Sequence, residues 1–409
     1  MRPIARWLLF AFVFAAPWEF SLELNEPFGP VARIAGLLML LAAVPAVLQA
    51  GRIRRPGPTQ WAVLALFLWF CCTCFWTIDQ AATLQKLRAY FQEMMTVWLV
   101  WELAESPRDL RRLLRAYVAG SWELALITLA SFTFPSAAAS GQIRFFAEGL
   151  DPNDTARFLD LAFPFAAVLM NGETKWPGRI LAGGYFPLGI VAVLLTASRG
   201  GALAAAVGLA GAGVILVGRR PRRALAAAIA FPIVALAAWL IVPTGTLARI
   251  ATVAEQFQGT DLNERVNIWV QGWQAFRGAP IFGWGAGSFV TAAGLSPIDT
   301  AHNTALSIAV GSGICGLLLA AAILLLAMRT VLAMPGPLLI AFATGLAVWI
   351  MTSLTASVEE SRTTWLLFAL IAFAGRLVHE DAGAHGFRAW NPSPGPSPVR
   401  VKEAASEFR

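Results

Sequence analysis

Charged residues are scarce in this sequence of 409 residues. Asp, Glu, Lys and Arg together make up 13% of it, whereas soluble domains average about 25%. Hydrophobic residues supply 57% of the chain, and its mean hydropathy is +0.64. This composition excludes an ordinary water-soluble globular protein, and it predicts a chain that is solvated mainly by lipid.

Side chains that bind metals are also few. The chain has four cysteines and three histidines, and no cysteine has a histidine partner at metal-ligand spacing. Cys71, Cys72 and Cys74 lie in one apolar run and Cys315 in another, where we interpret the thiols as small buried apolar groups. No nucleotide-binding motif occurs either. We therefore expect neither a metal ion nor a cofactor.

Long apolar runs are abundant, and their length suits membrane-crossing helices of about 20 residues. They predict an all-α polytopic membrane protein with about twelve transmembrane helices. The first run follows two arginines, as in a signal peptide, but Pro17, Trp18 and Glu19 stand where a cleavage site is needed, so we interpret it as a retained helix. The twelve runs cover residues 4–18, 31–50, 60–78, 89–104, 114–134, 156–170, 180–197, 200–217, 224–242, 303–328, 337–355 and 363–378.

The distribution of Lys and Arg between the runs favours one orientation in the membrane. With a cytoplasmic amino terminus, 21 of the 31 Lys and Arg residues lie on the cytoplasmic side, as the positive-inside rule requires. We therefore expect both termini in the cytoplasm, a transmembrane domain over 1–378 and a disordered cytoplasmic tail over 379–409. The net charge of +7 is then mainly a signal of topology and does not indicate nucleic acid binding.

Ten positive charges fall on the outer side of the membrane in this orientation. Arg33, Lys86 and Arg88 are explained by snorkelling to the headgroups. The other seven come from four separate chain regions that share one face, and an ionisable residue at the end of a span is a functional candidate. The alternative to a functional role is that each of these arginines forms an ion pair with an acidic residue on the same face. The seven are Arg144, Arg157, Arg199, Arg249, Arg265, Arg277 and Arg362.

Arg199 is the least easily explained by such pairing. It lies in the hairpin TASRGG, between two apolar runs, and no acidic residue is next to it. The two glycines that follow allow backbone amides to approach an anion closely. Because a guanidinium group matches phosphate in a bidentate manner, several of them at headgroup level predict a lipid-linked phosphate or pyrophosphate as ligand.

The outer segment 243–302 is large enough to fold over the membrane. Within it, NERVNIWVQGWQAFRGAP has apolar residues at a spacing that gives one helical face, which predicts an amphipathic helix in the interface. These residues are Ile268, Trp269, Trp273 and Phe276. Arg265 lies one turn before Trp269 and therefore on the same side.

His302 follows this segment, in the motif HNTAL at the start of the tenth run. The other histidines lie near or in the predicted tail, so His302 is the sole imidazole expected on the arginine-rich side. An unperturbed pKa near 6.5 suits a general base at neutral pH. The alternative is a helix start capped by His302 or Asn303, and the neighbouring arginines favour catalysis.

A third element, GLDPNDTARFLDLAFP, combines a turn with the start of the sixth run. Asp151 and Asp154 allow either a divalent-metal site or a capped helix start. No third ligand is obvious and a Pro-Asn-Asp turn caps helices readily, so we favour capping without a metal. Asn153 and Arg157 lie one helical turn apart, and we expect both to face the same opening on the outer side of the membrane.

TASRGG, DPND, ERVNIW and HNTAL, on a chain with twelve predicted spans, together resemble the O-antigen ligase family. The resemblance covers roughly residues 130–365. It implies a fold like that of GT-C glycosyltransferases, with the active site at the periplasmic face of a Gram-negative inner membrane. The implied reaction moves polysaccharide from undecaprenyl pyrophosphate to a sugar of the lipid A core. Inversion of the anomeric centre, without a metal or cofactor, is expected.

The resemblance also implies roles for individual residues. Arg199 and Arg265 would hold the pyrophosphate, and His302 would be the base that activates the acceptor hydroxyl. Arg144 and Arg157 receive the pyrophosphate-binding role mainly from their location. Supporting roles are expected for Asn303, Asn153 and Arg362.

Three other functions remain open at this point. An O-antigen polymerase shares the donor chemistry but transfers to another lipid-linked glycan. A protein O-oligosaccharyltransferase transfers to protein. A transporter or flippase of lipid-linked glycans is a different class, which should place charge near the bilayer midplane in repeated halves. The arginines here gather at one face, and this arrangement favours a transferase.

Overall fold

A computed structural model describes residues 2–19, 21, 23–24, 29–134, 143–172, 175–218, 221–252 and 265–382. The predicted tail therefore lies outside the described residues from 383 onward, as do the two arginines at 219 and 220. Helices dominate the described residues, and the two short strands form one antiparallel pair.

The described helices run in two long groups along the chain. The amino-terminal group is α1 (Arg2–Ala15), η1 (Ala16–Trp18), α2 (Val31–Ala50), α3 (Pro58–Cys72), η2 (Thr73–Phe75), α4 (Gln80–Leu103) and α5 (Pro107–Thr133), with β1 (Glu23–Leu24) and β2 (Gly29–Pro30) between η1 and α2. The second group is α6 (Pro152–Asp160), α7 (Ala162–Gly172), α8 (Trp176–Leu195), α9 (Arg199–Val217), α10 (Pro221–Ile241), α11 (Thr244–Ala251), α13 (Arg265–Gly278), α14 (Phe289–Ala293), α15 (Thr304–Leu332), α16 (Gly336–Ser353), η4 (Val358–Glu360) and α17 (Arg362–Ala382).

Every predicted apolar run lies on a helix, but fewer than twelve helices qualify as spans. Seven of the described helices are long and apolar enough to cross a membrane, or eight if α10 and α11, bent by 116°, form one span. The structure therefore supports a helical multi-pass membrane protein and leaves the count of twelve unconfirmed. Among the helices that carry a predicted run, those that do not qualify are α1, α4, α17 and the pair α6 and α7.

The physical reasons differ among these helices. α1 has 14 residues, and the sixth run is divided between α6 and α7 at Leu161. α4 carries Lys86, Arg88 and Glu93, and α17 carries charged residues at both ends. Charge in an otherwise apolar helix is costly in lipid unless it is paired inside the protein.

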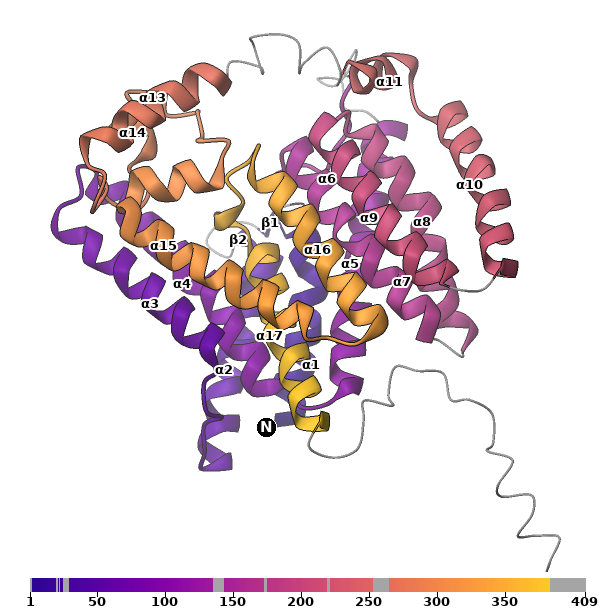
Figure 1. The fold of residues 1–409 in the computed structure, drawn as a ribbon, viewed down its shortest axis with the longest axis horizontal. Helices are drawn as coiled ribbons and strands as arrows, with labels where there is room; N and C mark the ends of the chain where they lie inside the picture. The colour runs from indigo at the N-terminus through magenta and orange to yellow at the C-terminus, as the bar shows by residue number, and fades with distance from the viewer. Residues whose placement is uncertain are drawn as a thin grey trace, which may run out of the picture.

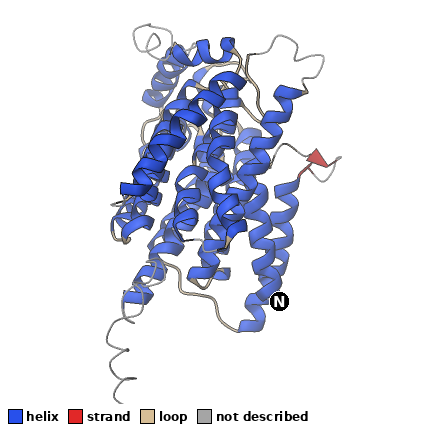
Figure 2. Cartoon of the chain, turned by 90° about the vertical axis from the view of Figure 1, so that its right-hand side faces the viewer, coloured by secondary structure: helices blue, strands red, loops and turns tan. Residues whose placement is uncertain are grey.

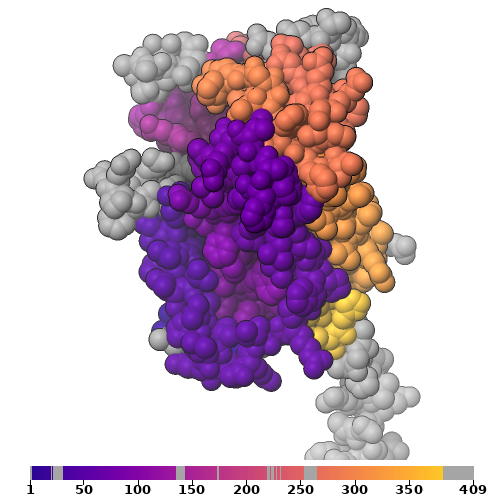
Figure 3. Space-filling view, turned by 90° about the vertical axis from the view of Figure 1, so that its left-hand side faces the viewer, coloured from indigo at the N-terminus to yellow at the C-terminus, as the bar shows by residue number. Residues whose placement is uncertain are grey.

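The long helices run roughly side by side and form a bundle (Figures 1 and 2). The start of α1 and the end of α17 lie at one end of the bundle, whereas α6, α11, α13 and α14 lie at the other (Figure 1). Figure 3 shows the side on which α2 and α3 face the viewer, with the segment around α13 and α14 above. The main core runs through the bundle and includes α1, whose Leu9 and Val13 are fully buried.

α15 bends at Gly313, which adopts a left-handed backbone conformation with φ of +65°. The bend frees three carbonyl groups of the preceding turn. Trp284 and Gly285 donate backbone N–H bonds of 2.9 Å to Val310 and Gly311, and the Trp69 indole donates one of 2.9 Å to the Ser312 carbonyl. The segment after α13 is thus fixed against α15.

The outer part of α15 packs in a second, smaller core. Ile268 and Ala275 of α13, Phe289 of α14, Ala301 and Val310 form it. α13 lies within the segment where the sequence predicts an amphipathic helix, and it ends at Gly278. Ile268, Gly272 and Ala275 are buried against the protein, whereas Trp273 is 56% exposed.

Candidate active site

Five arginines line one cavity at the outer end of the bundle. The cavity has a volume of about 390 Å³ and lies among α6, α9, α11, α13 and the end of α16. Trp269 and Leu354 supply part of its apolar wall. Four of the arginines are those predicted to bind pyrophosphate, and the fifth was on the outer side but received no role. They are Arg144, Arg157, Arg199, Arg265 and Arg249.

The hairpin between α8 and α9 positions the cavity. Ser198 caps α9 by accepting a bond of 3.1 Å from the Gly201 N–H, and its hydroxyl donates one of 2.7 Å to Asn153 Oδ1. Arg144 donates to the Thr196 carbonyl at 3.2 Å and to Asn153 Oδ1 at 3.4 Å. Asn153 therefore joins three chain regions that are distant in the sequence.

Arg199 is the first residue of α9, a helix of 19 residues whose amino terminus lines the cavity. The helix dipole and the first backbone N–H groups favour an anion there. Gly201 has a packing reason to be glycine, because a Cβ at that position would collide with Cβ of Ala156 in α6. Gly200 meets no such obstacle and lines the cavity itself.

The positive charges interact with one another. Burial, the neighbouring Arg249 guanidinium and, more weakly, those of Arg265 and Arg199 lower the pKa of Arg144, although Asp151 acts in the opposite sense. Burial and Arg199 also lower the pKa of Arg265. A shift of this kind shows that the cations are held close together in a partly desolvated place, where a bound anion would relieve the repulsion.

Arg157 is buried and lines both this cavity and its neighbour. Its Nη2 donates to Asp154 at 2.6 Å, and its guanidinium lies 4.7 Å from the centre of the Phe158 ring. Within the described part of the chain, Nε and Nη1 have no hydrogen-bond partner. Because unpaired buried donors are costly, these atoms are available to a ligand.

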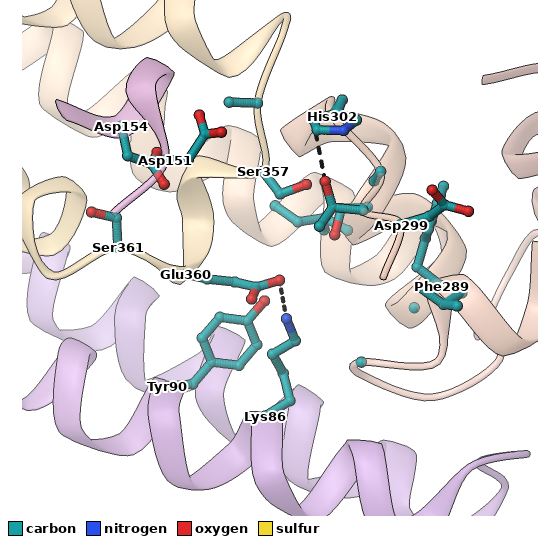
Figure 4. Close-up of a pocket in the computed structure, with 18 of the residues that line it drawn as sticks. Lys86, Tyr90, Asp151, Asp154, Phe289, Asp299, His302, Ser357, Glu360 and Ser361 are labelled. Atoms are coloured by element: carbon teal, nitrogen blue, oxygen red, sulfur yellow. Dashed lines mark hydrogen bonds and ion pairs between the residues drawn. The ribbon is translucent and has the colours of Figure 1, made fainter. Parts of the chain in front are cut away.

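His302 lines the neighbouring cavity, which has a volume of about 530 Å³ (Figure 4). The two cavities share Asn153, Arg157, Thr355 and Ala356 as lining residues. The residues predicted as base and as pyrophosphate ligands therefore lie around two adjoining spaces. Their catalytic roles stay predictions.

The backbone of His302 is left-handed, with φ of +46°, directly before the α15 cap. Its Nδ1 lies 3.2 Å from the Thr300 hydroxyl. Burial and the positive charge of Arg265 lower the pKa of His302, although Asp151, Asp299 and Asp154 act in the opposite sense. The imidazole is therefore held in its neutral form near neutral pH, and the neutral form is the one that accepts a proton.

Carboxylates surround the His302 cavity, and most already have partners. Asp151 caps α6 by accepting a bond of 2.7 Å from the Asn153 N–H, and Asp154 pairs with Arg157. This confirms the capping interpretation of Asp151. Asp299 accepts a bond of 3.0 Å from the Ser296 N–H. Among the described residues, no group of three His, Cys, Asp or Glu side chains is arranged to hold a metal ion.

The α15 start holds the opposite wall in place. Asn303 caps α15 by accepting from the Leu306 N–H at 2.9 Å, and its amide nitrogen donates to the Leu354 carbonyl at 3.3 Å. Thr304 donates to the Ala356 carbonyl and accepts from the Val358 N–H, both at 2.9 Å. The supporting role expected for Asn303 is thus filled by structural contacts.

Two cations that were predicted on the outer side have other surroundings than the sequence analysis suggested. Lys86 does not snorkel to the headgroups, because it forms an ion pair with Glu360 at the His302 cavity (Figure 4). Arg362 is buried and paired with Glu19, and it lines a separate cavity that shares no residue with the arginine cavity. The structure therefore does not bring Arg362 to the arginine cavity. In both cases the position of the cation is explained by an ion pair with a carboxylate that is distant in the sequence.

Comparison with known proteins places part of the site in a family. Residues 184–321 match the family model described as O-antigen ligase. The match contains Arg199, Arg249, Arg265 and His302, and it ends within α15. No curated protein matches the chain. Over these residues the chain is similar to the O-antigen ligase family, to which the sequence motifs also point.

Proposed function

We propose that this protein is an O-antigen ligase, which transfers polysaccharide from undecaprenyl pyrophosphate to a sugar hydroxyl of the lipid A core. The observation that carries the proposal is the wall shared by the arginine cavity and the His302 cavity. One space suits a diphosphate and the other offers a neutral imidazole beside polar side chains. The O-antigen ligase match over residues 184–321 supports the same chemistry.

The proposed donor site is the arginine cavity. Guanidinium groups from five chain positions and the amino terminus of α9 would bind the diphosphate. As the glycosidic bond to the diphosphate breaks, its electron pair goes to the leaving phosphate oxygen. Positive groups already fixed around that oxygen stabilise the growing negative charge. The arginines thereby supply the charge stabilisation, and we propose that the reaction uses no metal.

The proposed base is His302. Its neutral imidazole would take the proton of the acceptor hydroxyl, and the acceptor oxygen would then attack the anomeric carbon opposite the leaving diphosphate. The new glycosidic bond forms as the old one breaks, which inverts the anomeric centre. Both substrates are lipid-anchored, so we propose that the site faces the periplasm at a Gram-negative inner membrane.

The experiment supplies purified protein in lipid nanodiscs with an undecaprenyl pyrophosphate-linked glycan. Three acceptors are offered separately: lipid A core, a second lipid-linked glycan and an acceptor protein. We expect product on the lipid A core, and none with His302→Ala. Product on the second glycan would assign polymerase activity instead, and product on protein would assign an oligosaccharyltransferase.

A transport assay tests the alternative that the protein is a flippase of lipid-linked glycans. Liposomes that contain the protein and a fluorescent lipid-linked glycan report movement between leaflets through a membrane-impermeant quencher. We expect no protein-dependent movement. Rapid movement that persists in His302→Ala, together with no transfer to any acceptor, would replace the enzyme by a flippase.

A further inference from the structure

A third cavity lies apart from the arginine cavity and shares no lining residue with it. Its volume is about 290 Å³, and it is enclosed by α1, α2 and α4. The walls are almost wholly apolar and include Phe12, Gly36, Leu37, Phe91 and Met95. The surface between α2 and the helices beside it is recessed on this side of the molecule (Figure 3). We refer to this cavity as the α2–α4 groove.

The outer end of the α2–α4 groove is polar. Arg33, in the first turn of α2, is exposed, and Arg362, the first residue of α17, is buried. Arg33 lies where a lipid headgroup would meet the protein, and Arg362 is neutralised by Glu19. The other walls are apolar except for Gln92. An amphiphile with an acyl chain and an anionic head matches this division.

The groove is connected to the proposed reaction site through one ion pair. Arg362 pairs with Glu19, and Glu19 lines the His302 cavity. The three spaces therefore follow one another: arginine cavity, His302 cavity and α2–α4 groove. Asn153 and Arg157 lie between the arginine cavity and the His302 cavity. The Glu19–Arg362 pair lies between the His302 cavity and the α2–α4 groove.

We propose that the α2–α4 groove holds an acyl chain of the acceptor glycolipid, with its anionic head at Arg33 and its glycan extending into the His302 cavity. This proposal rests on the proposed function. The donor diphosphate occupies the opposite side of the His302 cavity, so the acceptor hydroxyl has to approach from another direction. The groove provides that direction from within the membrane.

The length of the groove suits one hydrocarbon chain. Its lining residues on α4 run from Phe91 to Leu99. Eight residues of helix correspond to about 12 Å at 1.5 Å per residue. This is a large part of one leaflet, since the whole hydrocarbon core is about 30 Å thick.

Photocrosslinking tests which molecule occupies the groove. Leu37→p-benzoylphenylalanine places the probe on the lining, and Leu38→p-benzoylphenylalanine is the matched control on the next residue, which does not line the groove. The two side chains are 56% and 47% exposed, so both reach lipid. In nanodiscs that contain lipid A core, donor and phospholipid, we expect at least fivefold more lipid A core adduct at position 37 than at 38. Predominant adducts with phospholipid, with donor or with a second copy of the chain would overturn the proposal.

Filling the groove provides a kinetic test. Gly36→Leu extends a side chain from a position whose Cβ would meet the Phe12 ring at an ordinary 3.4 Å. We expect about a tenfold higher KM for the acylated acceptor, with kcat and the donor KM unchanged. Leu41→Phe on the exposed face of α2 is the control and should match the unmodified protein. An unchanged acceptor KM in a folded Gly36→Leu protein would contradict the proposal.

A deacylated acceptor separates this proposal from the proposed function. The water-soluble core oligosaccharide lacks the chain that the groove would hold, so Gly36→Leu and the unmodified protein should use it equally. If the unmodified protein transfers glycan to no acceptor, the proposed function fails. The crosslinking result then still decides what the groove binds.

Discussion

The Thr300 hydroxyl lies 3.2 Å from Nδ1 of His302, while the His302 backbone takes a left-handed conformation that non-glycine residues seldom adopt. A neutral imidazole carries one proton. When Nδ1 holds that proton and donates it to Thr300, Nε2 keeps the lone pair that a base needs. In that tautomer the contact with Thr300 orients the imidazole and leaves Nε2 as the base.

Removing this contact should slow the reaction without weakening substrate binding. For Thr300→Val we expect a kcat about five- to tenfold lower, since one neutral hydrogen bond contributes about 1 kcal/mol. KM values for both substrates should stay unchanged. Thr300→Ser keeps the hydroxyl and should restore most of the rate. Equal rates for Thr300→Val and the unmodified protein would show that Thr300 does not position His302.

Donor binding should depend on where an arginine lies along α13. Arg265→Ala removes a guanidinium from the arginine cavity, whereas Arg277→Ala removes an exposed one from the last turn of the same helix. We expect donor Kd to rise about 10- to 100-fold in the first variant, because a hydrogen bond to a charged group contributes about 1.5–3 kcal/mol. The second variant should bind as the unmodified protein does. Titration of a fluorescent lipid diphosphate measures both, and equal Kd values would remove Arg265 from the donor site.

The acid limb of the pH profile should move when Arg265 loses its charge. Burial and Arg265 lower the pKa of His302, so the neutral base persists below pH 6.5, and activity falls only as the pH drops through the lowered pKa. Arg265→Gln removes a cation that disfavours the imidazolium, so the pKa of His302 should rise and the acid limb should move to higher pH. Arg265→Lys keeps the charge and should leave the limb in place.

Chemical modification measures this titration without a substrate. Diethyl pyrocarbonate reacts with neutral imidazole, and His302→Ala supplies the background from the other two histidines. We expect half-maximal reactivity of His302 at a higher pH in Arg265→Gln than in Arg265→Lys. An identical midpoint in both variants would show that Arg265 exerts no electrostatic effect on His302.

The bend in α15 should tolerate no side chain. A Cβ at Gly313 would collide with the backbone of Ile281, and its φ of +65° is unfavourable for other residues, by about 1–3 kcal/mol. We therefore expect Gly313→Ala to lower the thermal unfolding temperature and the yield of folded protein. Gly213→Ala is the matched control in α9, where a Cβ meets open space. A Gly313→Ala protein as stable as the control would show that the bend is not required.

The sequence predicted those features that depend on local composition. Hydropathy located a helix at every apolar run, and the positive-inside pattern assigned Arg199 and His302 to the same face. Asp151 was recognisable as a cap because a turn precedes an apolar segment, whereas a cap at Asn303 was only the alternative to catalysis at this helix start.

Features that depend on contacts between residues distant in the sequence could not be predicted from the sequence. The position of Lys86 in the sequence is typical of a snorkelling residue. Its ion pair with Glu360, which is more than 270 residues away in the sequence, appears only in the folded structure. Arg362 belongs to the same outer face as Arg265, yet Glu19 draws it to another cavity. Gly313 ends the stretch Gly311-Ser312-Gly313 within an apolar run, which marks a weak point in the helix, but the bend itself depends on the loop before α14 that docks on it.

The bend at Gly313 also divides α15 into two units with different neighbours. Above it, Val310 belongs to the small outer core, and below it Ile323 and Ala327 belong to the main one. Substitutions above the bend would therefore change the packing against α13 and α14, whereas substitutions below it would change the packing of the helical bundle.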